Sequence, residues 1–151
     1  MKLLSDASEY ALRAVVWLAQ EPGKPKKVRE IATGTGAAPG YLVKVLQALA
    51  KAGILSAQRG VHGGFALIRD AAELSVLEVI NAVDPVERIR RCPLGLKTHQ
   101  EDLCPMHKRI DDAMAAIEAS LSESTIGEML RESSLPPPLC DVRGNAQVPG
   151  V

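Results

Sequence analysis

Two of the three cysteines and two of the three histidines in the chain lie in one short stretch, RRCPLGLKTHQEDLCPMH, at residues 90–107. The four candidate ligands in this stretch are Cys92, His99, Cys104 and His107. Thiolate and imidazole are suitable ligands for an iron–sulfur cluster or for zinc, and a cysteine thiolate can also be an axial ligand of haem. The ligand types favour a [2Fe-2S] cluster, and they leave zinc, haem and no bound metal as alternatives.

The remaining soft side chains are not counted as metal ligands. Cys140 lies alone near the C-terminus, and His62 lies in a glycine-rich turn where a DNA contact or simple solvation is expected. A nucleophilic Cys104 with His107 as its base was considered as an enzymatic alternative. Such a pair needs an orienting group and a substrate pocket, and the sequence indicates neither. We therefore do not expect an enzyme.

The composition predicts one helical, soluble domain. The chain has 151 residues, of which 46% are apolar and only 3% aromatic, so its core must consist of Ala, Leu, Val and Ile. No apolar run is long enough for a membrane span, and the N-terminus lacks the apolar core of a signal peptide. We expect a cytoplasmic protein, where clustered cysteines indicate metal or redox chemistry more than disulfides.

The zero net charge conceals an asymmetry between the two halves of the chain. Residues 1–70 contain ten Lys/Arg against five Asp/Glu, a difference of +5, whereas residues 71–151 contain eight against thirteen, a difference of −5. The run from Lys24 to Arg59 has seven basic residues and only one acidic residue, Glu30. Such a run is typical of a surface that binds a polyanion, although an ordinary solvated face would look similar.

The order of predicted elements in the first half is that of a winged helix-turn-helix. Apolar spacing predicts helices over 8–20, 26–36 and 38–53, and two β-prone runs at 54–57 and 65–68 flank a glycine-rich turn. The fold class is therefore mainly α with a small β-wing. The polar face of the third helix contains Tyr41, Lys44 and Gln47, which we expect to meet DNA together with Arg59.

The second half is predicted to contain a loop and a long helix. A capping box at Ser75 and Glu78 starts a helix over 75–85, the prolines make 86–105 a loop, and a helix of about 16 residues follows from Met106. An apolar stripe along this helix predicts either core packing or a dimer contact. The stripe consists of Met106, Ile110, Met114, Ile117 and Leu121. The predicted divisions are a DNA-binding domain at 1–85, a sensor loop at 86–105, a dimerisation region at 106–131 and a disordered tail at 132–151.

Four stretches resemble the Rrf2 family of winged-helix regulators: MKLLSDASEYALRAVVWLA, VREIA, PGYLVKVLQALAKAGIL and RGVHGGFAL. The resemblance covers roughly residues 1 to 130. It implies a homodimer that binds a palindromic operator in double-stranded DNA. It also implies a cysteine-bearing loop before a dimerisation helix, and a repressor that senses redox state, iron or nitric oxide through a cluster. Family members that bind no cluster imply the alternative of a cofactor-free, zinc-binding or haem-binding regulator controlled by a metabolite or protein partner.

The resemblance also implies a ligand set. Cys92 and Cys104 match the first and third cysteines of the family's cluster loop, and His107 matches its histidine ligand. The middle cysteine is replaced by Thr98, with His99 beside it as a reserve ligand. Some members take a carboxylate from the first helix of the other subunit, and the matching residue is Glu9.

The recognition helix departs from the family pattern. Iron–sulfur members have YLEQL where this chain has YLVKV, so that Val43 and Lys44 replace Glu and Gln. Valine cannot accept a hydrogen bond from a cytosine amine, and lysine favours a guanine edge or a phosphate. The operator is therefore expected to differ. Arg59 in the wing suits a narrow minor groove, and Lys26 and Lys27 are expected to bind phosphate.

Overall fold

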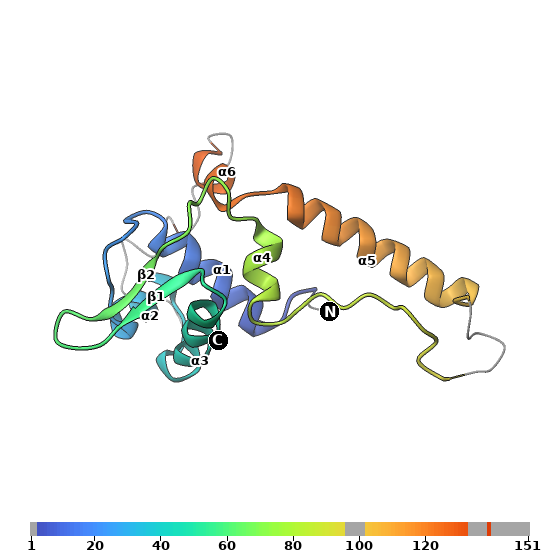
Figure 1. Cartoon of the computed structure of the whole chain (residues 1–151), viewed down its shortest axis with the longest axis horizontal. Helices are drawn as coiled ribbons and strands as arrows, with labels where there is room; N and C mark the ends of the chain where they lie inside the picture. Colours follow the sequence, from blue (N-terminus) through green and yellow to red (C-terminus); the bar gives the residue numbers. More distant parts are fainter. Residues whose placement is uncertain (1–2, 96–101, 133–138, 140–151) are drawn as a thin grey trace.

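The computed structural model describes residues 3–95, 102–132 and 139, and it consists of helices with one small sheet. This confirms the predicted fold class, mainly α with a small β-wing. None of the helices within the described residues is both long and apolar enough to cross a bilayer. In chain order (Figure 1) the elements are α1 Asp6–Leu18, α2 Val28–Thr35, α3 Pro39–Lys51, β1 Leu55–Gln58, β2 Gly64–Leu67, α4 Val76–Asn81, α5 Pro105–Glu123 and α6 Ile126–Arg131.

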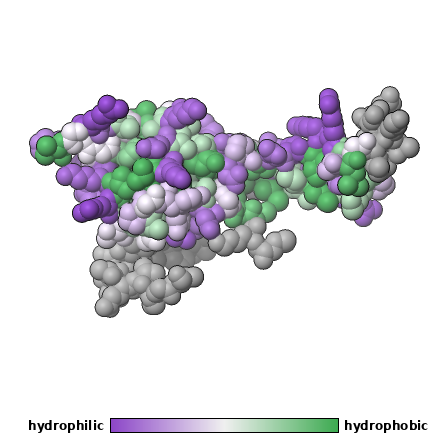
Figure 2. Space-filling model, turned by 90° about the horizontal axis from the view of Figure 1, so that it is seen from below, coloured by the Kyte–Doolittle hydropathy of each residue, from purple (hydrophilic) through white to green (hydrophobic). Residues whose placement is uncertain are grey.

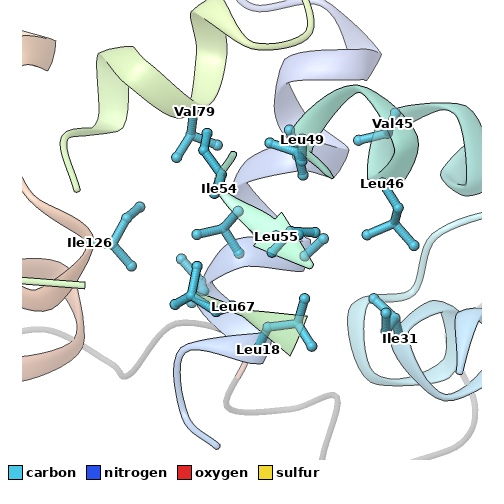
Figure 3. Packing of buried hydrophobic residues seen from close by; sticks show 14 of the residues in the cluster. Leu18, Ile31, Val45, Leu46, Leu49, Ile54, Leu55, Leu67, Val79 and Ile126 are labelled. Atoms are coloured by element: carbon cyan, nitrogen blue, oxygen red, sulfur yellow. The ribbon is translucent and has the colours of Figure 1, made fainter. Parts of the chain in front are cut away.

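The core lies between the first three helices and the hairpin (Figure 3). α3 shows why the sequence folds this way locally. Pro39 occupies its first turn, where a missing N–H costs nothing. Its inward face is buried, with exposed fractions of 0 to 3%, and this face consists of Leu42, Val45, Leu46 and Leu49. The opposite, polar face of α3 is therefore left at the surface.

The wing is an antiparallel hairpin in which Leu55 pairs with Leu67 and Gln58 with Gly64. A bridge between Lys26 and Phe65 adds the chain before α2 to its edge. Gly64 is required here, because a Cβ at this position would overlap the backbone of Lys26. Gly64 thus allows β2 to pair closely with the chain that leads into α2.

The last helix returns to the winged domain. Capping boxes begin both α4, at Ser75, and α6, at Thr125, and these two residues form an isolated bridge. Ile126 is fully buried in the core (Figure 3). The predicted dimerisation region at 106–131 thus includes a helix that packs on its own core.

An arm extends from this body (Figure 1). We define the arm as residues 86–95 and 102–123, which are α5 and the described part of the chain that leads to it. The first segment runs beside α5, and hydrophobic surface continues onto the arm (Figure 2). Within the arm so defined, only Cys92 and His107 are buried. The predicted disordered tail lies outside the described residues except for Glu132 and Leu139.

Candidate DNA-binding surface and cysteine site

Six of the seven residues predicted to bind DNA are exposed, and the seventh, Lys26, is half-buried and paired with Glu21. The six exposed residues lie at the N-terminus of α2, on the polar face of α3 and in the turn of the wing. The apolar spacing of α3 turns its polar residues outward, and the glycines place the wing turn beyond the core. The six are Lys27, Tyr41, Lys44, Gln47, Arg59 and His62.

Ion pairs divide the basic residues into two groups. Lys24 and Lys26 bind the carboxylate of Glu21 through Nζ–Oε2 distances of 3.3 and 3.2 Å, and hydrogen bonding from Lys26 is the main cause that lowers the pKa of Glu21. Lys26 also lies over the ring of Trp17, 5.8 Å from its centroid. The basic groups of the six exposed residues form no ion pair with any residue in the described part of the chain, so their charges are available to an anionic ligand.

A chain of contacts that the sequence did not predict joins α1 to the recognition helix. The rings of Tyr10 and Tyr41 meet edge to face with centroids 5.7 Å apart. The guanidinium of Arg13 lies 5.8 Å from the centroid of Tyr10 and donates to Glu9 at 2.9 Å. The position of Tyr41 at the start of α3 is thus tied to the polar face of α1.

Two of the predicted metal ligands meet at the start of α5. Cys104 is the N-cap of this helix, and one turn later His107 brings its Nδ1 to 3.4 Å from the sulfur. Cys92 and His107 are 8% and 9% exposed. His99 lies outside the described residues. Thiol and imidazole in contact are a suitable start for a metal site.

The described residues do not complete that site within one chain. They contain no group of three or more histidine, cysteine or acidic side chains positioned to hold a metal. Glu9 pairs with Arg13 on α1 instead of joining the cysteines. The donor types fit an iron–sulfur cluster, but only Cys104 and His107 are brought into contact.

The stripe predicted for dimerisation is divided between two environments. Met106 and Ile110 are 58% and 45% exposed. Met114, Ile117 and Leu121 line a cavity of about 220 Å³ at the base of the arm, together with the start of α1 and the end of α4, and Leu121 also packs on the core. One end of the stripe therefore packs within its own chain, and the other end is exposed.

Comparisons with known proteins agree with this arrangement. The model of the Rrf2 family, described as an iron-dependent transcriptional regulator, matches residues 4–132. IscR of T. potens is 25% identical, with a TM-score of 0.70 over 88% of this chain and 88% of that chain. CymR, the global cysteine regulator of B. subtilis, is 20% identical, with a TM-score of 0.68 over 85% of this chain and 96% of its own. CymR of Staphylococcus aureus is 23% identical, with a TM-score of 0.62 over 81% and 93%.

The two CymR structures share the fold, and the family match covers most of the chain. Proteins of this family are transcription regulators that bind DNA, which confirms the predicted regulator over the enzymatic alternative. The chain therefore belongs to the Rrf2 family of transcriptional regulators.

Proposed function

We propose that this regulator is a homodimeric repressor of a palindromic operator, and that a [2Fe-2S] cluster controls its affinity for DNA. Redox state, iron supply or nitric oxide would be the signal. Family membership and the exposed polar face of α3 support the DNA-binding part. In this proposal Lys44 meets a guanine edge in the major groove, Arg59 enters the minor groove, and Lys27 binds phosphate.

The exposed apolar end of α5 supports the homodimer. This helix has 19 residues, and His107 is the one that its own chain buries. Met106 and Ile110 remain exposed on its predicted stripe. A long helix with exposed apolar side chains along one end of its stripe is typically covered by a second copy.

The contact between Cys104 Sγ and His107 Nδ1 is the observation that carries the cofactor proposal. Cys92 would be the second thiolate and the partner subunit's Glu9 the fourth ligand, with His99 in reserve. A bound cluster would supply a one-electron couple and a site that reacts with oxidants or nitric oxide. Imidazole and carboxylate are harder ligands than thiolate, which would leave one iron less firmly held.

The contacts of Glu9 support it as the residue that links the cysteine site to DNA binding. Its carboxylate binds Arg13, which lies on Tyr10, which contacts Tyr41 at the start of α3. A change in the partner of Glu9 therefore acts on a continuous set of side chains that ends at the recognition helix. The contact between Cys104 and His107 is different, because it lies entirely within the first turn of α5.

Visible absorption of the anaerobically purified full chain tests the cofactor proposal. Cys92→Ala and Cys104→Ala should each abolish the absorption, whereas Cys140→Ala, a matched loss of one thiol, should retain it. Glu9→Ala should leave a labile chromophore, with a DNA affinity that no longer follows its state, and His99→Ala should change little.

Two results would overturn parts of this proposal. A bleached His99→Ala variant together with a silent Glu9→Ala variant would place the whole site within one loop. A colourless parent, or one with the visible spectrum of haem, would favour the alternative regulator, which binds zinc, haem or no cofactor and responds to a metabolite or protein partner. Elemental analysis and haem assay of the same sample distinguish these cases.

A further inference from the structure

Arg88 is clamped onto α5 by two carboxylates. Its Nε and Nη2 donate to the two oxygens of Asp111 at 2.7 and 2.6 Å, and its Nη1 donates to Glu118 at 3.3 Å. The backbone N–H of Ile89 donates to Asp111 as well, at 2.9 Å. Two parallel bonds from one planar guanidinium fix orientation as well as distance, so the backbone around Arg88 is held in one position on the helix.

This clamp differs from the other ion pairs between described residues. Its Arg88 and Asp111 side chains are 19% and 13% exposed, and they are 23 positions apart in the chain. The other pairs join residues no more than nine positions apart, as in Arg69–Glu78, and are more exposed. The other pairs link side chains that are already close along the chain, whereas this pair joins two separate segments of the arm.

The clamp lies beside the cysteine site. His107, Asp111 and Glu118 are spaced by four and seven residues, which places them on one face of α5. The rise from Asp111 back to His107 is about 6 Å. Cys92 is three residues beyond Ile89, a reach of at most about 10 Å, on a segment that runs beside α5 (Figure 1). Cys92 can therefore lie level with His107.

Apolar packing holds this segment at its start, where Val86 packs against the core, and it is sparse further out. In the described part of the arm, the buried side chains are those of Cys92 and His107 alone. The neighbours of Cys92, Pro93 and Leu94, are exposed. Between Val86 and Cys92, the described contacts that fix the segment on α5 are the bonds of Arg88 and Ile89 to Asp111 and of Arg88 to Glu118.

We propose that Arg88 is a positioning residue, which holds Cys92 buried against α5 by anchoring its segment to Asp111 and Glu118. This inference deepens the proposed function, since it concerns a residue that we assign as a cluster ligand. The clamp consists of protein groups alone, so the inference can be tested on the metal-free protein.

The test is the rate at which iodoacetamide alkylates each cysteine in the reduced, metal-free full chain, read peptide by peptide by mass spectrometry. Arg88→Met should raise the rate at Cys92 by about tenfold or more and leave the rate at Cys104 within about twofold of the parent. Arg88→Lys should retain part of the protection, because an ammonium keeps the positive charge but cannot form the two parallel hydrogen bonds to Asp111. Arg109→Met is the matched control. It removes an exposed arginine of α5 and should behave as the parent.

Asp111→Asn provides an independent variant that keeps the shape of the side chain, and it should also expose Cys92. Unchanged rates at Cys92 in both variants would refute the inference. An equal acceleration at Cys104 would refute it as well, because Arg88 would then support the whole arm. A parent without a cluster would overturn the proposed function and leave this test intact, since the alkylation rates are measured without metal.

Discussion

Replacing Lys27 with alanine should make DNA binding less sensitive to salt, whereas replacing Lys24 should not. Both are exposed lysines before or at the start of α2, and both substitutions remove one positive charge. They differ in their partners. Lys24 binds Glu21 at 3.3 Å, while the ammonium of Lys27 forms no ion pair within the described residues. A lysine already paired with a carboxylate neutralises little of a phosphate's charge.

The magnitude follows from the number of unpaired charges on the proposed surface. Each cation that approaches the duplex, at a phosphate or in a groove, is counted as releasing one counterion. With Lys27, Lys44 and Arg59 from each of two subunits, about six counterions are released, so the slope of log K against log salt is about −5.4. Doubling the salt should then weaken binding roughly 40-fold. Lys27→Ala removes two of these contacts, which changes the slope to about −3.6 and the loss on doubling to roughly 12-fold.

Fluorescence anisotropy with operator and random duplexes, at salt concentrations from about 0.1 to about 0.4 M, measures these slopes. The Lys24→Ala variant should keep the slope of the parent. Equal changes for Lys24→Ala and Lys27→Ala would show that the pairing with Glu21 does not decide which lysines meet DNA, and the reasoning would fail.

Three further outcomes are expected. Lys44→Ala should change the base preference of the operator, measured by selection from random duplexes, and equal weakening on every sequence would place Lys44 on the backbone instead. Ile110→Asp should convert the dimer to monomer in analytical ultracentrifugation, because burying an unpaired carboxylate is costly, whereas Arg109→Asp should not. The pKa of Asp111 is lowered to about 2, chiefly by the hydrogen bond from Arg88. Its contribution to stability is therefore fully present above its ordinary pKa and is lost as the pH falls toward about 2, so the parent and Asp111→Asn should converge in urea unfolding at low pH.

The sequence predicted the elements whose signals are local. The spacing of Leu42, Val45 and Leu49 required a helix with one buried face, and Ser75 with Glu78 marked the start of α4. Each of these signals extends over one or two helical turns, where backbone geometry alone decides which side chains share a face. The exposure of Lys44 and Gln47 followed from the same spacing.

Of the proposed cysteine site, only the local contact between Cys104 and His107 could be predicted from the sequence. Cys104 and His107 are one turn apart on a helix, so their contact was implied once α5 began at Pro105. Cys92 is separated from Cys104 and His107 by a loop, so its spacing in the sequence does not predict where it lies relative to them. Glu9 illustrates the same limit, since its partner in the described structure is Arg13, one turn away on α1.

The sequence by itself thus determined α1 to α3, the start of α4, the wing and the exposed face of α3, because each depends on neighbours along the chain. The helix predicted over 75–85 ends earlier, at Asn81, and α6 was not predicted as a separate helix. Tertiary structure alone decided that Glu21 neutralises Lys26, that Tyr41 rests on Tyr10, and that Arg88 reaches Asp111. The last two pairs join segments that only the fold brings together, whereas Glu21 and Lys26 meet within the turn between α1 and α2. Charge and aromatic partners have no periodic signature in sequence, so which cations remain free for DNA and what holds Cys92 in place were set by the fold.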